Sequence, residues 1–513
     1  MKASNQLYDL IKSLTPDEEL HFKNSSSIQQ GEKNYIKLYN YIKSQDDYDE
    51  EEVKKYFKHE VFIQHLASEK NQLLHHVLKS LRHYRYENSI SAQVDEEIKN
   101  IQILFNKSLY KQSRKQLSII KKKANDHELF YSLLDIIELE KSLIDMEAYY
   151  GDINYKTVDE LIEEENTIFL KIENCAAFDI QLAKLNAISS KITTAIETSD
   201  INDIKQLLTD TKKLASNKNI LSNKSKIIYL YTIGSCNRLL NKMDEVYKLF
   251  SDLIIEMENN PEIISEMPNY YILSHGSLIR YYAINQQYSN GFKLIEKLKS
   301  LSLNKMFKAT DLQINIFSQS YITEMLLYCY IGEHDQAKKL IPLVIENLDK
   351  YDSKINNEDL LRIYHAIAMV YFGIGEFNKS LHWLNKIINQ NYENLRQDIV
   401  RISKLIYLIV HFEIGNDDLL HYIYKSTLRF FNTQKNQHQF EAIFLNHFKK
   451  IAILKKENKQ GDPYQLLKKE LITVFKNSFE KNALEFFNFY AWLDSKTYSI
   501  SFSDAIRLRK ENL

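Results

Sequence analysis

The chain contains few of the residues that interrupt helices. Its 513 residues include only 10 glycines and 5 prolines, whereas average proteins contain roughly 7% glycine and 5% proline. So few breakers argue against a protein of short strands and tight turns, and they favour long helices joined by short turns. Leucine, lysine and glutamate, which are good helix formers, are frequent. We therefore predict an all-α protein.

Cysteine is scarce as well. Cys175, Cys236 and Cys329 are far apart, odd in number and outside any C-x-x-C pattern. Neither a disulfide framework nor a zinc site is therefore predicted, and a reducing compartment is the simpler interpretation. No apolar stretch approaches the ~18 residues of a membrane helix, and the N-terminus lacks a run of signal-peptide length. We expect a cytoplasmic protein without a membrane span.

The chain also lacks excess charge and known catalytic motifs. Its net charge is −1, so nothing in the balance indicates nucleic acid or an anionic membrane as a partner. Phosphate-binding loops, nucleophile elbows and H-E-x-x-H pairs are absent. Gly373-Ile374-Gly375 lacks a third glycine, and the adjacent His75 and His76 point in different directions on a helix. We expect no cofactor, no metal site and no enzymatic activity.

Turn-like positions recur between helical patterns at a spacing of roughly 40 to 48 residues. Self-similarity at such a period predicts a helical solenoid, in which each repeat packs only on its neighbours. Because solenoids mostly bind other molecules, this period favours a binding function over catalysis. The turn positions are Ser108, Gly151, Ser199, Asn241, Gln286, Gly332, Gly375 and Gly415.

The clearest repeat covers residues 363–388, with the sequence IYHAIAMVYFGIGEFNKSLHWLNKII. Its apolar residues follow the i, i+3, i+4, i+7 spacing of one buried helix face, and Gly375 stands at the turn, where a positive φ is least costly for glycine. The unit resembles a tetratricopeptide repeat, although the usual proline is missing and the period exceeds the family's. The matching residues are Tyr364, Ile367, Ala368, Tyr371, Gly375, Phe377, Ser380, Leu384 and Ile387.

This resemblance implies a right-handed superhelical solenoid of tetratricopeptide-like hairpins. We expect about eight helix pairs over residues 91–435, with an N-terminal helical domain over 1–90 and a C-terminal helical cap over 436–513. The N-terminal part, with LIKSL and GEKNY, is similar to uncharacterised bacterial repeat proteins. Within the cap, ALEFFNFYAWL (483–493) is predicted to be one apolar helix. Predicted N-terminal helices cover residues 7–14, 16–24, 34–43, 50–59 and 68–85.

In tetratricopeptide repeats the first helix of each pair lines the concave face, so the resemblance also implies a binding groove. Its apolar and aromatic residues with a few arginines suit an extended or helical peptide that carries carboxylates. Three of the arginines are expected to share one wall. An alternative is that these positions only pack neighbouring helices. The predicted groove residues are Tyr231, Arg238, Arg280, Ile322, Leu326, Arg362, His365, Met369, Phe372 and Phe412.

We therefore expect a non-enzymatic protein- or peptide-binding scaffold. The alternative is a transcriptional or signalling regulator whose N-terminal helices contact DNA while the repeats sense a peptide. The segment 67–85 suggests this alternative because it carries Lys70, Lys79, Arg82 and Arg85, as a recognition helix could. Burial of this helix against residues 91–125 would favour the scaffold, whereas an exposed helix on a three-helix core would favour the regulator.

A second basic stretch, between residues 107 and 123, contains no acidic residue, and an acidic segment from Asp126 to Glu165 follows it. We expect the two segments to lie on neighbouring helices and to neutralise each other rather than to form a phosphate-binding patch.

Overall fold

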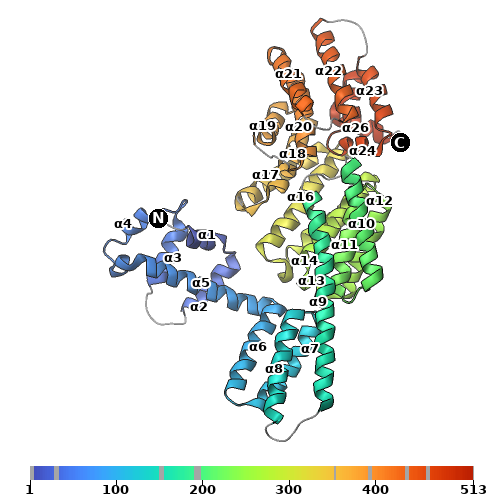
Figure 1. Ribbon diagram of the computed structural model, residues 1–513. Coiled ribbons are helices and arrows are strands. Elements are labelled where there is room, and N and C mark those ends of the chain that lie inside the picture. The colour runs from blue at the N-terminus through green and yellow to red at the C-terminus, as the bar shows by residue number, and fades with distance from the viewer. Residues whose placement is uncertain are drawn as a thin grey trace. The chain divides into compact units, whose positions relative to one another are not determined.

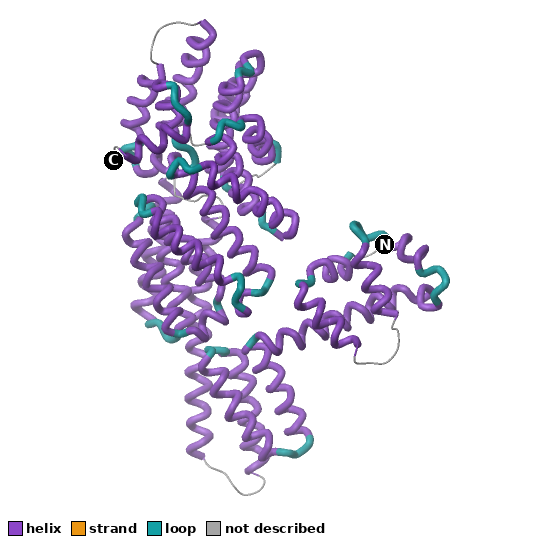
Figure 2. The backbone as a smooth tube through the Cα atoms, turned by 180° about the vertical axis from the view of Figure 1, so that it is seen from behind, coloured by secondary structure: helices purple, strands orange, loops and turns teal. Residues whose placement is uncertain are grey.

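The protein is helical throughout the part of the chain that is described (Figure 1), and no strand occurs there. Figure 2 shows the same helices and their connecting loops from behind. The predicted all-α class is confirmed. The chain divides into two compact units, Met1–Ile168 and Phe169–Leu513. The computed structural model describes residues 5–27, 34–148, 155–189, 198–351, 354–390, 395–433, 438–457 and 463–511.

The first unit contains the short N-terminal helices and the longer helices α6, α7 and α8 that follow them. Helices α1 to α5 agree with the five predicted helices within a few residues and bury a common core around Leu38, Tyr39 and Ile42. Helices α6, α7 and α8 pack side by side (Figure 1). The elements are α1 (Gln6–Ser13), α2 (Pro16–Ser27), α3 (Asn34–Ser44), α4 (Glu50–Tyr56), η1 (Val61–His65), α5 (Leu66–Asn88), α6 (Ile90–Asn106), α7 (Tyr110–Asp126), α8 (Phe130–Ala148) and the first part of α9 (Tyr155–Ser189).

Local sequence explains where several of these helices begin. The Glu18 amide donates to the Thr15 hydroxyl (3.3 Å), and the Thr15 amide donates to the Glu18 carboxylate (2.8 Å). This reciprocal capping box satisfies two amides that the first turn of α2 leaves without helical partners. At α4 the Asp49 carboxylate accepts from two amides of the first turn.

The basic stretch and the acidic segment of the first unit lie on neighbouring helices, as predicted, and one lysine of the stretch, Lys121, is paired with the acidic segment. Lys121 on α7 bridges Glu140 on α8 (2.5 Å) and Glu164 on α9 (2.6 Å). Lys141 on α8 pairs with Glu165 on α9 (2.7 Å). These ion pairs connect three neighbouring helices.

The second unit contains most of the helix pairs. Its elements are the rest of α9, α10 (Thr198–Lys218), α11 (Asn223–Leu239), α12 (Met243–Asn259), α13 (Pro261–Glu266), α14 (Pro268–Ile284), α15 (Tyr288–Leu301), η2 (Lys305–Phe307), α16 (Thr310–Tyr330), α17 (His334–Tyr351), α18 (Asn357–Gly373), α19 (Phe377–Ile388), α20 (Gln397–Ile414), α21 (Asp417–Thr433), α22 (Gln439–Glu457), α23 (Pro463–Val474), α24 (Ser478–Lys481), η4 (Asn482–Glu485), α25 (Phe489–Tyr498) and α26 (Phe502–Glu511).

Five helix pairs of this unit share one pattern of contacts. The two helices of each pair touch: α11 with α12, α14 with α15, α16 with α17, α18 with α19, and α20 with α21. In addition, the first helix of each pair touches the first helix of the next, from α11 through α14, α16 and α18 to α20. We call these five the first helices. Their mutual contacts place residues that are about one repeat apart in sequence on one shared surface.

Six of the eight predicted turn positions adopt a positive φ and end a helix. At Gly375, for example, its amide donates to the Phe372 carbonyl (3.0 Å) and the Glu376 amide donates to the Tyr371 carbonyl (2.9 Å). The other five positions repeat this Schellman arrangement, which satisfies the last carbonyls of a helix. The positions are Ser108 (59°), Asn241 (56°), Gln286 (57°), Gly332 (79°), Gly375 (78°) and Gly415 (80°).

The other two predicted turns fall in a less regular region. Gly151 lies outside the described residues. Ser199 lies inside α10, so the turn predicted there is wrong. The preceding helix, α9, runs without a break over the 35 residues Tyr155–Ser189, because this stretch contains no glycine or proline and is rich in good helix formers. The boundary between the two units, after Ile168, falls inside α9.

The C-terminal segment corrects another prediction. Residues 483–493 do not form one helix, because η4 ends at Glu485 and α25 begins at Phe489. The Asn488 side chain accepts the Ala491 amide (3.0 Å) and caps α25, while Phe487 and Phe489 on either side of it are both buried. The break lets two successive parts of an apolar stretch pack in different directions.

Candidate ligand-binding cavity

Six of the ten predicted groove residues line one cavity of about 380 Å³ in the second unit. They come from four of the five first helices. Their side chains therefore meet across repeats, although they are more than 130 positions apart at the extremes of the sequence. They are Tyr231 and Arg238 on α11, Arg280 on α14, Leu326 on α16, and Arg362 and His365 on α18.

The remaining wall comes from polar side chains and from the C-terminal segment. Asn315 and Gln319 on α16 contribute amide groups, and Arg396 contributes a fourth guanidinium at the start of α20. Glu485, the last residue of η4, and Phe486 after it close one side. The cavity volume falls in the range of roughly 300–1,000 Å³ that is usual for ligand sites.

Each of the three carboxylates that line this cavity is paired with one of its four arginines. The Arg280–Glu485 pair is a two-pronged fork, which is a strong and directional arrangement. Arg396 also bonds to Asp398 (2.9 Å), so that guanidinium is held from two sides. The pairs are Arg280–Glu485 (Nε–Oε2 3.0 Å, Nη2–Oε1 3.2 Å), Arg362–Asp359 (3.0 Å) and Arg396–Glu358 (3.1 Å).

Arg238 differs from the other three arginines. Among the described residues, its guanidinium has no hydrogen-bond or ion-pair partner. Burial, followed by repulsion from Arg280 and then by a smaller repulsion from Arg396, lowers the pKa of Arg238 to about 10. Tyr231 and Glu358 oppose this shift only in part. The side chain still carries its charge at neutral pH.

Two side chains of the first helices hold the backbone of the C-terminal segment. The Tyr330 hydroxyl donates to the Glu485 carbonyl (2.7 Å), and Nε2 of His365 lies 3.0 Å from the Phe486 carbonyl. Burial lowers the pKa of His365 to about 4, so the ring is neutral and donates from Nε2. The face therefore already binds two successive main-chain carbonyls of this segment.

A second cavity, of about 590 Å³, lies on the other side of this segment. Glu485 and Phe486 line both cavities, and Met369 on α18, a predicted groove residue, lines the second. The Asn241 amide donates to the Asn482 side chain (3.2 Å) and fixes the start of the segment to the turn after α11.

The last three predicted groove residues are not open to a ligand. Ile322, Phe372 and Phe412 are buried in the core. Phe372 packs against Phe487 (ring centroids 5.1 Å apart) and Phe502 (5.0 Å) of the C-terminal segment, and Phe412 packs against Trp492. The expectation of an open aromatic surface at these positions is thereby corrected, because the chain covers them itself.

Arg396, Glu485 and Phe486 were missed in the sequence analysis. One signal was available: Glu485 is the only acidic residue in the apolar run 483–493, and a carboxylate inside such a run needs a partner when it packs. Arg396 precedes α20 in a left-handed conformation with φ of 41°, and no motif in the sequence marks it.

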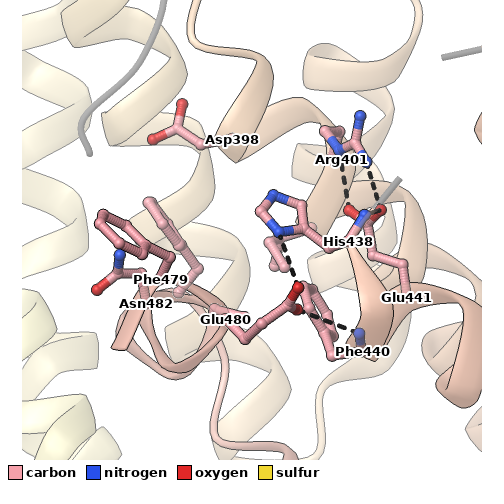
Figure 3. Close-up of a pocket in the computed structure, with 11 residues that line it drawn as sticks. Asp398, Arg401, His438, Phe440, Glu441, Phe479, Glu480 and Asn482 are labelled. Atoms are coloured by element: carbon pink, nitrogen blue, oxygen red, sulfur yellow. Dashed lines mark hydrogen bonds and ion pairs between the residues drawn. The ribbon is translucent and has the colours of Figure 1, made fainter. Parts of the chain in front are cut away.

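A third cavity, of only about 40 Å³, lies where α22 begins (Figure 3). Arg401 and Glu441 face each other there and form two hydrogen bonds. Glu480 accepts two backbone amides at the start of α22, from positions that include Phe440, and lies 3.7 Å from His438. Although burial raises the pKa of Glu480, these hydrogen bonds lower it overall. The cavity is too small for an organic ligand, and its charges fasten α22 to the C-terminal segment.

The basic helix of the first unit has two different faces. On α5, Leu73 and Val77 are fully buried in the N-terminal core, whereas Lys79, Arg82 and Arg85 are exposed. The helix packs mainly on α2 and α3 and also touches α6. The apolar face of α5 is therefore buried, which favours the scaffold in part. Its basic face is exposed, which favours the regulator in part.

Comparison of the chain with protein-family models, curated proteins and solved structures found no match. In the part of the chain that the structure describes, no group of three histidine, cysteine or acidic side chains is placed to hold a metal ion. Within the same ranges, no helix has both the length and the apolar character needed to traverse a bilayer.

Proposed function

We propose that the protein is a non-enzymatic scaffold that binds a peptide or an extended protein segment on the shared face of its first helices. We further propose that the helix pairs form a right-handed solenoid of tetratricopeptide-like hairpins. The contacts between successive first helices and the repeated Schellman turns support this arrangement. In such an arrangement, side chains from several repeats meet on one concave face.

One observation carries the proposal: four successive first helices supply the walls of a single cavity, and this cavity contains an arginine that has no partner among the described residues. The chain's own segment indicates how a ligand is held. Tyr330 and His365 bind main-chain carbonyls, and Arg280 binds the Glu485 carboxylate. A peptide that presents main-chain carbonyls and an acidic side chain would make contacts of the same kinds.

A display library of random peptides, panned on the immobilised full-length protein, tests the proposal. We expect selection of peptides that contain an acidic residue and an aromatic one. Their affinity should fall about tenfold or more when Arg362 is replaced by Glu, because the new carboxylate stands beside Asp359 on the cavity wall and repels an acidic ligand. Arg429→Glu is the matched control, since Arg429 is exposed on α21 and does not line the cavity. Selected peptides that tolerate Arg362→Glu as well as Arg429→Glu would count against this face.

The alternative function, a regulator that contacts DNA, rests on the exposed Lys79, Arg82 and Arg85 of α5. Its test is the fluorescence anisotropy of a labelled duplex with the full chain between about 50 and 200 mM salt. A phosphate-binding surface loses affinity steeply over that range. Tight, salt-dependent binding that weakens in the Arg82→Ala/Arg85→Ala variant would favour the regulator. Weak binding that is unchanged in this variant favours the scaffold.

A further inference from the structure

The 380 Å³ cavity contains one arginine that pairs with none of its lining carboxylates. Its three lining carboxylates each face one arginine, and Arg238 is left over. A half-buried cation without a partner destabilises a fold, because it loses hydration that no opposite charge replaces. Proteins retain such groups where function requires them. Arg238 thus has no partner among the described residues, and it lies in a cavity where a ligand can supply one.

The surroundings of Arg238 keep the site positive. Arg280 and Arg396 lie close enough to repel it, and this repulsion adds to the effect of burial on its pKa, which is lowered to about 10. At neutral pH the guanidinium therefore stays protonated. It offers up to five N–H donors in a planar fork, and that shape matches the two oxygens of a carboxylate.

The charges around Arg238 define the class of ligand. Arg396 is held by both Glu358 and Asp398, so four carboxylates already stand near the four arginines, and what remains unused is the hydrogen-bonding fork of Arg238. A phosphate group carries close to two negative charges at neutral pH, and the carboxylates of Glu358, Asp359 and Glu485 in the same cavity would repel the second. A singly charged, planar carboxylate fits this balance better than a phosphate.

We propose that Arg238 is the receptor for a single carboxylate on the ligand of this cavity. The carboxylate belongs either to the C-terminus of a peptide or to a small organic acid. This inference rests on the proposed function only where the ligand is a peptide. The sequence analysis predicted a ligand with several carboxylates bound by three arginines. The structure leaves one of these arginines for the ligand, because Arg280 and Arg362 already bind Glu485 and Asp359.

The first test removes the charge in the ligand-free, full-length protein. Replacing Arg238 with Met keeps an unbranched side chain and removes the unpaired cation. We expect the thermal unfolding temperature to rise, because the guanidinium forms no hydrogen bond or ion pair with a described residue that the substitution could break. The control Arg429→Met removes an exposed arginine on α21 and should leave the temperature nearly unchanged. A lower unfolding temperature for Arg238→Met would show that the guanidinium has a structural partner, and it would overturn the proposal.

The second test measures binding of defined probes. Pools of N-acetylated tripeptides with a free C-terminal carboxylate, and the same pools as C-terminal amides, are incubated with the full-length protein, and retained members are identified by mass spectrometry. Benzoate and benzamide form a second matched pair, compared through the unfolding temperature. We expect preference for the acid in at least one pair, with a loss of about tenfold or more in Arg238→Met.

The outcomes separate the two ideas. Acid preference that disappears in Arg238→Met and persists in Arg429→Met supports the carboxylate site, and the pair that shows it identifies the source. Equal retention of acids and amides, or of acids by wild type and Arg238→Met, overturns it. If panned peptides bind wild type and Arg238→Met equally, the scaffold function stands without this site. If only benzoate depends on Arg238, the site stands and the peptide function fails.

Discussion

The two ends of the first-helix face differ in what covers them. At the α11 and α14 end, Tyr231 and Arg238 line an open cavity. At the α18 and α20 end, Phe372 and Phe412 lie beneath rings of the C-terminal segment. We call these the open end and the covered end. Equivalent positions of similar repeats thus have different roles. Rings of residues 487–502 cover the α18 and α20 end, whereas at the α11 and α14 end the same part of the chain makes polar contacts, from Asn482 to Asn241 and from Glu485 to Arg280.

This difference separates two kinds of arginine as well. Arg280, near the covering segment, is matched by Glu485 from that segment. Arg238, one first helix earlier, is not matched by any described residue. A repeat pattern predicts which face of a helix a side chain occupies. Contact with the C-terminal segment determines whether that side chain stabilises the fold or remains available to a ligand.

The largest expected effect is a loss of stability in acid that comes from the covered end. His365 bonds to Phe486, and His334 bonds to Ser503 (2.8 Å), so both hold the cover. Burial lowers the pKa of each histidine to about 4, from an ordinary 6.5. Below pH 6.5 these histidines therefore bind protons in the unfolded chain, whereas in the folded chain they stay neutral until the pH falls to about 4. The free energy of unfolding should fall by about 3 kcal/mol for each histidine across that window.

Urea unfolding followed by tryptophan fluorescence measures this fall, because Trp383 and Trp492, the chain's two tryptophans, both lie in the second unit. The variant His365→Gln should show a shallower dependence on pH than wild type. His421→Gln, at an exposed position of α21, should not. Equal pH dependence in all three proteins would mean that the covered end is not the source.

Replacing a buried aromatic side chain of the C-terminal segment that packs on the covered end should have the next largest effect. Phe487 is buried and packs against Phe372, Phe489 and Phe502. We expect Phe487→Ala to lower the free energy of unfolding by about 3–5 kcal/mol, the usual cost of a cavity left by a buried ring. Tyr498→Ala, at an exposed site on α25, is the control. Similar costs for both variants would show that the cover contributes little.

A charge reversal at the fork should have a smaller effect. The side chains of Arg280 and Glu485 are 20% and 22% exposed, so the pair is partly screened by solvent. We expect Arg280→Glu to destabilise by about 1–3 kcal/mol, because it sets two carboxylates against each other. The swapped pair, Arg280→Glu with Glu485→Arg, should recover part of this loss in the same urea assay. Absence of any recovery would mean that the attraction between the two charges does not hold the cover.

The smallest expected effect is a difference in unfolding temperature between alanine substitutions at two turns, one of which contacts α26 and one of which does not. Gly332 and Gly375 have nearly the same φ, 79° and 78°, so alanine meets the same backbone strain, about 1–2 kcal/mol, at both. A Cβ atom at Gly332 would also lie 2.7 Å from the Ser503 carbonyl, whereas nothing lies within 4 Å at Gly375. Gly332→Ala should therefore have the lower unfolding temperature of the two. The reverse order would contradict the docking of α26 against this turn.

Local patterns predicted much of this architecture. The five N-terminal helices and six of the turns were found from caps, breakers and spacing, because these signals act within a few residues. The prediction failed at Ser199, which lies at the start of α10. The repeat spacing had been extended across the preceding region, where α9 runs without a break from Tyr155 to Ser189. The prediction failed again at residues 483–493, where an apolar run was interpreted as one helix although Asn488 divides it.

Only part of the candidate site was predicted, because only part of it depends on local sequence. The face of Tyr231, Arg238 and Arg280 follows from helix periodicity, which the sequence contains directly. The burial of Phe372 and the pairing of Arg280 depend on residues more than 100 positions away. Hydrophobicity alone does not tell whether an aromatic residue on a helix meets a ligand or another part of its own chain.

The sequence by itself determined the helices, most of their ends and the residues that share the first-helix face, since periodicity, capping and left-handed turn geometry are local properties. Only the tertiary structure decided which residues on that face remain accessible. The return of Glu485 and Phe486 to the first helices pairs Arg280, holds main-chain carbonyls at Tyr330 and His365, and leaves Arg238 unmatched. Such pairings depend on which distant charges and rings meet when the chain packs, and no local rule specifies them.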